Sequence, residues 1–196
     1  NKNFSRIKNL SVNVNGKTLK TEIKKGDLDI NKIPSPYLSG LFDNIIKLSY
    51  SFTASLETNR GCPYGCAYCD WGSPLMNCKK IIPFDAQRVK DEIEWFGKNK
   101  IEFVFGCDSN FGILPRDNDF IDKFIEVKNK YGFPQKFRTS YAKNSNQSIF
   151  EMNKKLNRHK MCKGVTLSFQ SLNAKTLEAV GRINMRIDNF KELLFP

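Results

Sequence analysis

The chain has 196 residues, of which 40% are hydrophobic, so it is long enough for one ordinary domain with a sizeable core and is not a disordered tail. Its uninterrupted apolar runs are only a few residues long, whereas a bilayer span needs roughly 20, so we expect no membrane segment. Thirty-two Lys and Arg against twenty Asp and Glu give a net charge of +12, which favours an acidic partner, but these cations are scattered singly and form no compact basic block.

Residues 1–50 differ in character from the rest of the chain. The stretch 10–23 alternates in polarity around Asn15-Gly16, which predicts a β-hairpin with a type I′ turn. Residues 28–43, "LDINKIPSPYLSGLFD", contain two prolines and a glycine, as an extended connector would. We therefore expect a boundary near residue 50, with residues 51–196 forming the core domain.

Residues 51–196 alternate predicted strands with predicted helices. The expected strands cover 51–58, 101–106 (ended by Gly106), 136–140 and 164–171. The first expected helix is capped by Asp85 and carries Val89, Ile93 and Phe96 on one face. The second covers 118–131, and the third is marked by Ile149, Met152 and Leu156. A short helix capped by Asn173 and a last segment with Phe190 and Leu194 follow.

This order predicts a parallel sheet with right-handed crossovers and helices packed outside it. A closed barrel of eight such units takes roughly 250 residues, so four units would form only part of one. The loops that leave the carboxyl ends of the strands should carry the site. These loops hold three nearby cysteines after the first strand, then "GCDSNFG", "SYAKN" and "QSLN" after the others.

The three cysteines, Cys62, Cys66 and Cys69, lie in "RGCPYGCAYC". Close thiolates on such a loop suit either zinc or an iron–sulfur cluster. A structural zinc site normally has four protein ligands, but Cys78 is nine residues beyond Cys69 and the single histidine, His159, is expected at a helix end. On a four-iron cluster, three thiolates would leave one iron open to chelate a small molecule. Because the chain also lacks the apolar core of a signal peptide at its start, we expect reduced thiols and a cytoplasmic location.

These residues carry a family resemblance. "RGCPYGCAYC" is similar to the CxxxCxxC signature of the radical S-adenosylmethionine (SAM) enzymes, including the aromatic Tyr68 before the third cysteine. "FVFGCDSNFG" resembles that family's Gly-Gly-Glu-type segment after strand two, and "GVTLSFQSLNAKTLEAVGR" resembles its fourth strand and following helix. The resemblance covers residues 51–196. It implies an α/β fold, a partial TIM-like (β/α) barrel with about four of its six βα units present, and hence a piece of a longer protein.

The resemblance also implies roles for particular residues. Cys62, Cys66 and Cys69 would bind a [4Fe-4S] cluster whose open iron chelates SAM. The remaining cofactor-binding positions would be Tyr68 against the adenine, Gly106, Cys107 and Asp108 at the methionine amino group, Ser168 and Gln170 at the ribose or the methionine carboxylate, and Arg182 at that carboxylate. Cys107 and Asp108 depart from the family's second Gly and its Glu. The residues alone also allow other roles. Asp108 could cap a turn, Gln170 could begin a helix, and Cys107 and Cys162 could be buried inert thiols. Trp71 could pack beneath the cysteine loop, and Cys78 could serve an auxiliary cluster.

The activity implied by the resemblance is reductive. An electron donor such as flavodoxin or ferredoxin would reduce the cluster, which would cleave SAM to methionine and a 5′-deoxyadenosyl radical that abstracts hydrogen from a substrate. The connector 28–43 resembles the linker that follows a cobalamin-binding domain in the B12-dependent group, which implies cobalamin in a preceding domain and either methyl transfer or rearrangement of a carbon skeleton. Two alternatives stay open: a methylthiotransferase-like enzyme that modifies tRNA or a ribosomal protein, and a non-catalytic iron–sulfur carrier or zinc-binding module. Whether the substrate is a small molecule, a peptide or RNA is not decided by these residues.

Overall fold

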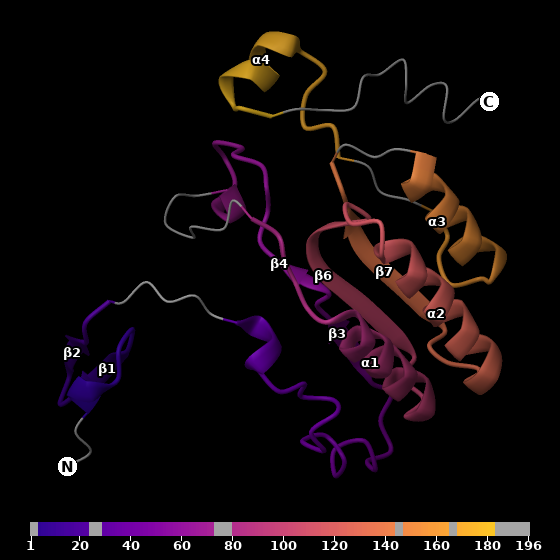
Figure 1. The fold of residues 1–196 in the computed structure, drawn as a ribbon, viewed down its shortest axis with the longest axis horizontal. Coiled ribbons are helices and arrows are strands. Elements are labelled where there is room, and N and C mark those ends of the chain that lie inside the picture. Colours follow the sequence, from indigo (N-terminus) through magenta and orange to yellow (C-terminus); the bar gives the residue numbers. More distant parts are fainter. Residues whose placement is uncertain (1–3, 24–28, 73–79, 144–146, 165–167, 183–196) are drawn as a thin grey trace. The chain divides into compact units, whose positions relative to one another are not determined.

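The computed structural model describes residues 4–23, 29–72, 80–143, 147–164 and 168–182 (Figure 1). The chain divides into two compact units, Asn1–Lys32 and Ile33–Pro196. The connector residues after Lys32 therefore belong to the larger unit, whereas the sequence suggested a boundary near residue 50. Tyr37 shows why, because its ring lies 5.2 Å from that of Trp95 and 4.8 Å from that of Phe96.

The smaller unit contains the predicted hairpin. After the short 3-10 helix η1 (Phe4–Arg6), strands β1 (Ser11–Val14) and β2 (Lys17–Lys20) pair antiparallel, which leaves Asn15 and Gly16 as a two-residue turn. Both turn residues have positive φ, 53° and 79°, as a type I′ turn requires. The predicted hairpin is therefore confirmed. A second 3-10 helix, η2 (Ile30–Lys32), ends this unit.

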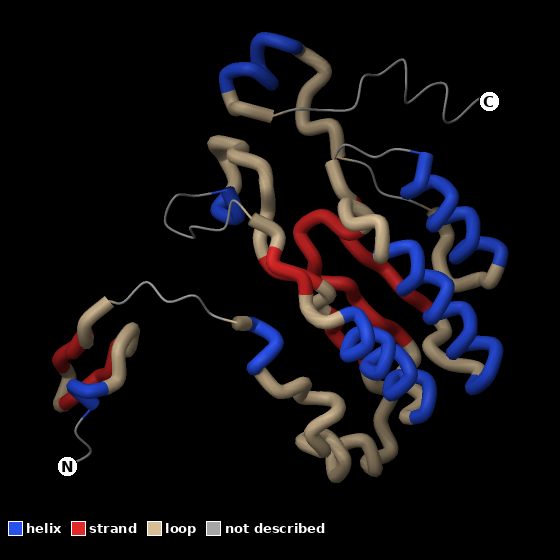
Figure 2. The backbone as a smooth tube through the Cα atoms, viewed as in Figure 1, coloured by secondary structure: helices blue, strands red, loops and turns tan. Residues whose placement is uncertain are grey.

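The larger unit is built on a parallel three-stranded sheet with the order β3-β6-β7 (Figure 2). Its strands are β3 (Thr53–Leu56), β6 (Phe103–Phe111) and β7 (Lys136–Tyr141). Helices α1 (Ala86–Lys98), α2 (Asp117–Tyr131) and α3 (Gln147–Arg158) lie along one face of the sheet (Figure 1). The alternating strand–helix order and the parallel sheet are as predicted from the sequence.

Apolar side chains at helical and strand spacing form the core between these layers. Val89, Ile93 and Phe96 of α1 are fully buried, as their spacing predicts. Phe124 of α2 stacks on Phe137 of β7 with ring centroids 4.4 Å apart. Burying one such aromatic side chain contributes about 1.5–3 kcal/mol, so these contacts stabilise the packing of the helices on the sheet.

The helix ends follow the predicted capping chemistry. Asp85 accepts a hydrogen bond from the Arg88 backbone N–H at 2.9 Å at the start of α1. Asn173 accepts one from the Thr176 backbone N–H at 3.1 Å at the start of α4 (Ala174–Ala179). Both caps satisfy a backbone donor that has no partner inside its own helix.

Strand β6 extends five residues beyond the Gly106 at which it was predicted to end. Gly106 does not form a turn: it is buried beside β7, and a Cβ on it would lie 2.7 Å from Thr139 Oγ1. Glycine is therefore required by the close approach of two strands, not by a change of chain direction. The carboxyl end of this strand is consequently at Phe111, and Cys107 and Asp108 lie within it.

Two further predicted elements are not borne out in the described residues. Of the predicted fourth strand, 165–167 lie outside the described residues, and 164 and 168–171 are not in a strand. The segment with Phe190 and Leu194 also lies outside the described residues. No helix of the described ranges is long and apolar enough to cross a membrane.

A two-stranded ribbon closes the base of the cysteine-bearing loop. Strands β4 (Asn59–Arg60) and β5 (Ile82–Pro83) pair antiparallel, and the 3-10 helix η3 (Asp70–Gly72) lies between them in sequence. Arg116 joins the two sides of this ribbon, because its guanidinium donates to the Thr58 carbonyl at 2.8 Å and to the Phe84 carbonyl at 2.5 Å. The loop thus leaves from and returns to a fixed place beside β3.

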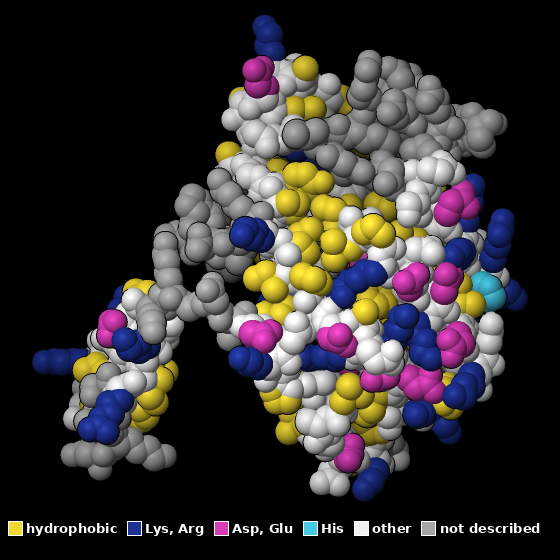
Figure 3. Space-filling view, viewed as in Figure 1, with side chains coloured by type: hydrophobic (Ala, Val, Ile, Leu, Met, Phe, Trp, Pro, Cys, Tyr) yellow, Lys and Arg dark blue, Asp and Glu magenta, His cyan; other side chains and the backbone are white. Residues whose placement is uncertain are grey.

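Charged side chains of both signs are mixed on the face of the larger unit shown in Figure 3. An example is Glu94 of α1, which pairs with Lys123 of α2 at 2.9 Å and with Lys130 at 3.0 Å. These contacts hold the pKa of Glu94 at about 2, with hydrogen bonds from Tyr131 and Lys123 as the largest causes. Cations paired in this way contribute to helix packing, which agrees with the scattered pattern seen in the sequence.

Candidate functional site

The cysteine loop carries thiols that are free and partly buried. Cys62 is 2% exposed and Cys66 is 3% exposed, whereas Cys69 is of intermediate exposure. The Cys69 backbone N–H donates to the Cys66 carbonyl at 3.0 Å, which forms a turn between the last two cysteines. Three free thiols on a single loop fit a thiolate ligand set.

In the described part of the chain, no three His, Cys, Asp or Glu side chains stand in an arrangement that could hold a metal ion. The ligand set Cys62, Cys66 and Cys69 therefore stays a prediction from the sequence. Cys78, the candidate for an auxiliary cluster, lies outside the described residues.

Asn110 is a site residue that the sequence reasoning missed. Its side-chain amide, 1% exposed near the end of β6, donates to the Cys62 sulfur at 3.1 Å. Its Oδ1 has no hydrogen-bond partner in the described residues. Beside it, the Ser109 hydroxyl donates to the Gly61 carbonyl at 2.7 Å, so the end of β6 is bound to the start of the cysteine loop. Extending the buried alternation of Val104 through "DSN" would have pointed to Asn110.

Lys143 is the second residue missed, although it lies in "SYAKN", which was expected to face the site. Its ammonium donates to the Cys66 sulfur at 3.5 Å and lies 5.4 Å from the centroid of the Tyr64 ring. Burial raises the pKa of Tyr64, and the neighbouring Cys62 raises it further. The loop after β7 therefore places a positive charge beside the second cysteine.

Asp108 holds the turn that leads into the cysteine loop. One carboxylate oxygen accepts the backbone N–H groups of Thr58 at 2.7 Å and Asn59 at 3.2 Å. The other accepts from the Thr58 hydroxyl and from the Asn59 side-chain amide at 3.1 Å. Burial raises the pKa of Asp108 to about 6, against the lowering effect of these hydrogen bonds. Asp108 therefore lies inside a strand and does not cap a local turn, and its predicted contact with the methionine amino group stays a prediction.

Cys107 differs from its predicted environment. We expected a buried thiol, but Cys107 is exposed, because on β6 it points away from the face that carries Gly106 and Asp108. Cys162 is partly exposed and donates to the Asn153 carbonyl at 3.7 Å. The expectation of a buried inert thiol is therefore wrong for Cys107. Trp71 is 43% exposed and thus only partly covered, and its expected packing beneath the loop stays a prediction.

Arg182 joins the segment after α4 to the cysteine loop. Its guanidinium, 4% exposed, donates to the Tyr68 hydroxyl at 3.0 Å and to the Ser168 carbonyl. The Ala67 backbone N–H also donates to the Val180 carbonyl at 2.9 Å. Three predicted cofactor residues, Tyr68, Ser168 and Arg182, are thus brought together. Gln170 lies on the same segment, exposed and with a positive φ of 62°.

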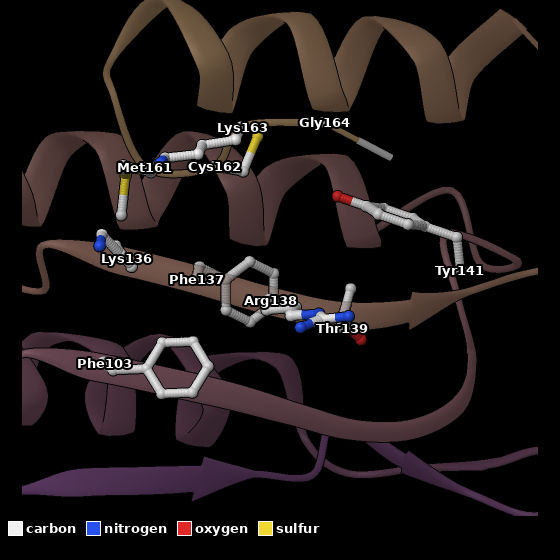
Figure 4. A pocket seen from close by; sticks show the side chains of 10 residues that line it. All are labelled: Phe103, Lys136, Phe137, Arg138, Thr139, Tyr141, Met161, Cys162, Lys163 and Gly164. Atoms are coloured by element: carbon white, nitrogen blue, oxygen red, sulfur yellow. The ribbon is translucent and has the colours of Figure 1, made fainter. Parts of the chain in front are cut away.

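A cavity of about 530 Å³ lies along the outer edge of β7 rather than at the cysteines (Figure 4). The segment 161–164 runs beside the strand and forms its other wall. It is lined by Phe103, Lys136, Phe137, Arg138, Thr139, Tyr141, Met161, Cys162, Lys163 and Gly164. None of these is a predicted site residue. In the described sheet β7 is an edge strand, so this cavity marks the side on which a fourth strand would pair.

Comparison with known proteins identifies relatives of this chain. A scan against protein-family models finds no match. The chain is 43% identical over 164 residues to the 2-(S-pantetheinyl)-carbapenam-3-carboxylate methyltransferase of Streptantibioticus cattleyicolor, and 42% identical over the same length to the cobalamin-dependent radical SAM methyltransferase TokK of Streptomyces tokunonensis. The resemblance to radical SAM enzymes is confirmed. Each alignment covers 82% of this chain and 24% of the relative, so the chain spans about a quarter of the length of these curated relatives.

Solved radical SAM structures share the fold. The methyltransferase TsrM from Kitasatospora setae, with tryptophan and a SAM analogue bound, matches 72% of this chain with a TM-score of 0.56 and 18% identity. The cobalamin-dependent enzyme OxsB matches 95% of this chain with a TM-score of 0.55 and 19% identity. The chain covers 27% of each. At this level of identity the likeness concerns the fold, an α/β arrangement on a parallel sheet.

Proposed function

We propose that this chain forms part of the catalytic core of a cobalamin-dependent radical SAM methyltransferase. The observation that carries the proposal is the identity of 43% and 42%, over 82% of the chain, to two curated methyltransferases, one of them named as cobalamin-dependent and radical SAM. The motif RGCPYGCAYC lies in the same chain and in a loop next to the carboxyl end of β3, where a site of this fold is expected.

Cys62, Cys66 and Cys69 are the residues that would hold a [4Fe-4S] cluster. When bound, the cluster would supply the electron that cleaves SAM to methionine and a 5′-deoxyadenosyl radical, which abstracts hydrogen from the substrate. The chemistry of the described residues supports this donor set, because the thiols are free and Cys62 and Cys66 each accept a hydrogen bond from a side-chain N–H group. The electron would come from a flavodoxin- or ferredoxin-like donor.

The SAM molecule would be held by the predicted set Tyr68, Gly106, Cys107, Asp108, Ser168, Gln170 and Arg182. The contact between Arg182 and Tyr68 supports these two members of the set, since it places a cation and an aromatic ring beside the third cysteine. We add Asn110, because its buried Oδ1 is free to accept a hydrogen bond from an amino group. Asp108 would act by fixing Thr58 and Asn59, which begin the loop.

The full arrangement would be a partial (β/α) barrel of radical SAM type. The open edge of β7 and the cavity along it support a further strand beside β7. Residues 1–50 would be a hairpin and the linker from a cobalamin-binding domain. The compact hairpin unit Asn1–Lys32, separate from Ile33–Pro196, supports that division in part. The substrate would be a small molecule that accepts a methyl group.

Anaerobic reconstitution tests the cluster. The chain is incubated with iron and sulfide, reduced, and studied by electron paramagnetic resonance with and without SAM. We expect a reduced [4Fe-4S] signal that SAM alters, and its loss in Cys62→Ala, Cys66→Ala and Cys69→Ala. Cys162→Ala removes a partly exposed thiol outside the cysteine loop and should keep the signal. Stoichiometric zinc in place of iron would contradict the proposal.

Methyl transfer is tested separately, on the longest protein that contains this chain. Isotopically labelled methyl from SAM should appear in a small acceptor in the presence of cobalamin and a reductant, and the carbapenam substrate of the curated relative is the first acceptor to try. A cluster that binds SAM without any labelled product from such acceptors would support the cofactors and contradict a substrate of that class.

A further inference from the structure

Two side-chain nitrogens are directed at cysteine sulfurs from the ends of two neighbouring strands. The Asn110 amide, near the end of β6, lies 3.1 Å from Cys62 Sγ. The Lys143 ammonium, just after β7, lies 3.5 Å from Cys66 Sγ. Because β6 and β7 are paired and parallel, their carboxyl ends bring both donors to the same loop.

Asn110 is not explained by packing alone. It is 1% exposed, and its only described partners are Cys62 and the Ser109 hydroxyl, which its amide reaches at 3.1 Å. Its Oδ1 is buried without a partner in the described residues, which costs about 1–3 kcal/mol. An apolar side chain would avoid this cost. The contacts that the Asn110 amide does make are those of its N–H groups, to Cys62 Sγ and to Ser109 Oγ.

Lys143 is not explained by an ordinary surface ion pair. Within the described ranges its ammonium has no carboxylate at ion-pair distance. Its described contacts are the Cys66 sulfur and the face of Tyr64, and its side chain is only partly exposed. A half-buried cation with these two contacts has its charge directed at the sulfur.

Such contacts affect electron transfer. Reduction of an iron–sulfur cluster adds one electron and therefore one negative charge, part of which is carried by the sulfur ligands. A hydrogen-bond donor or a positive charge at these sulfurs stabilises the reduced form more than the oxidised form, and so raises the reduction potential. The effect is larger where water is excluded, as it is at Cys62 and Cys66.

We propose that Asn110 and Lys143 are positioning residues that stabilise the reduced state of a [4Fe-4S] cluster held by Cys62, Cys66 and Cys69. This proposal rests on the proposed function, since it requires that the loop binds a cluster. The electron comes from the flavodoxin- or ferredoxin-like donor, or from dithionite in the test. Lys143 contributes more than Asn110, because it carries a full charge.

The test is a redox titration of the reconstituted 196-residue chain, followed by electron paramagnetic resonance. Lys143→Met should lower the ratio of reduced to oxidised cluster about tenfold at the wild-type midpoint, which corresponds to about 59 mV for a one-electron couple. Asn110→Leu should lower it by a smaller factor in the same direction. Lys143→Arg keeps the positive charge and should keep most of the wild-type ratio of reduced to oxidised cluster. Lys154→Met is the matched control, because it removes an exposed charge on α3 that pairs with Glu151 at 3.0 Å, and it should leave the ratio unchanged.

Iron content and far-ultraviolet circular dichroism are measured on every variant. Equal midpoints for wild type, Lys143→Met and Asn110→Leu, at equal iron content, would overturn the proposal. If Asn110→Leu fails to fold, the comparison of Lys143→Met with Lys143→Arg tests the proposal. Equal midpoint potentials for these two variants would overturn the proposal as well. If no protein takes up a cluster, including wild type and Lys154→Met, the proposed function itself fails, and the proposal fails with it.

Discussion

The Arg182 guanidinium donates to the Tyr68 hydroxyl at 3.0 Å, although 114 positions separate the two residues in the sequence. With the hydrogen bond from Ala67 N–H to the Val180 carbonyl, this contact holds the cysteine loop against the end of α4. The loop that carries the three thiols is therefore fixed from a part of the chain that follows the sheet, not only by the strand that precedes it.

Arg182→Met should loosen the cysteine loop. Removing a buried guanidinium that donates to Tyr68 and to the Ser168 carbonyl leaves both acceptors without this donor, which costs about 1–3 kcal/mol. Hydrogen exchange read by mass spectrometry should show about tenfold or faster exchange in peptides that cover residues 62–69. Tyr68→Phe removes only one of the two contacts and should give a smaller increase. Unchanged exchange in Arg182→Met would show that the contact does not order the loop.

Gly106→Ala should destabilise the larger unit by about 1–3 kcal/mol. A Cβ at this position would lie 2.7 Å from Thr139 Oγ1 and 2.8 Å from Thr139 Cβ, so β6 and β7 would have to separate. Urea unfolding followed by circular dichroism measures the free energy of unfolding. Gly164→Ala is the matched control, since a Cβ there meets nothing within 4 Å. A loss of stability in Gly164→Ala equal to that in Gly106→Ala would contradict the steric explanation.

Arg116→Met should weaken the attachment of the cysteine loop. Its guanidinium joins the Thr58 and Phe84 carbonyls, which lie on the two sides of the β4–β5 ribbon. We expect a loss of about 1.5–3 kcal/mol in the free energy of unfolding, because hydrogen bonds to a charged group are lost. The exposed Arg60, which pairs with Glu57 at 2.8 Å, provides the control variant Arg60→Met, with an expected change of less than about 1 kcal/mol.

The pKa of Asp108 gives stability a defined dependence on pH. Burial raises this pKa from 3.8 to about 6, so the folded state binds the proton more tightly than the unfolded state does. The resulting stabilisation is present below about pH 4 and is lost as the pH rises through about 6, by up to about 3 kcal/mol. Urea unfolding from pH 4 to pH 7 should show this loss in wild type and a flatter profile in Asp108→Asn. Parallel profiles for the two proteins would contradict the assignment to Asp108.

Local patterns in the sequence predicted most of the fold. The cap at Asp85, the buried spacing of Val89 and Phe96, and the Asn15-Gly16 turn are all short-range signals, and the structure has each of them. The parallel sheet followed from the order of the elements. The end of β6 was misplaced because glycine was taken as a stop, while its real cause is the Thr139 side chain, 33 positions away in the sequence.

The candidate site was predicted only in part, because half of it consists of contacts that no local pattern contains. Tyr68 and Arg182 were found through the motif and its resemblance. Asn110 and Lys143 were missed because their importance comes from where β6 and β7 end relative to Cys62 and Cys66. Arg116 was missed for the same reason, since its two carbonyl acceptors lie 32 and 58 positions away.

The β4–β5 ribbon has a consequence for how this protein can change. Its pairing of Asn59 with Pro83 and of Arg60 with Ile82 keeps the two ends of the intervening loop together, whatever the loop contains. The entropy of closing a loop grows only slowly with its length, by about 0.6 kcal/mol for each doubling. Insertions between Cys69 and Ile82 should therefore cost the sheet little. This stretch is a place where the protein could acquire new sequence, or accept an engineered tag, while its fold is retained.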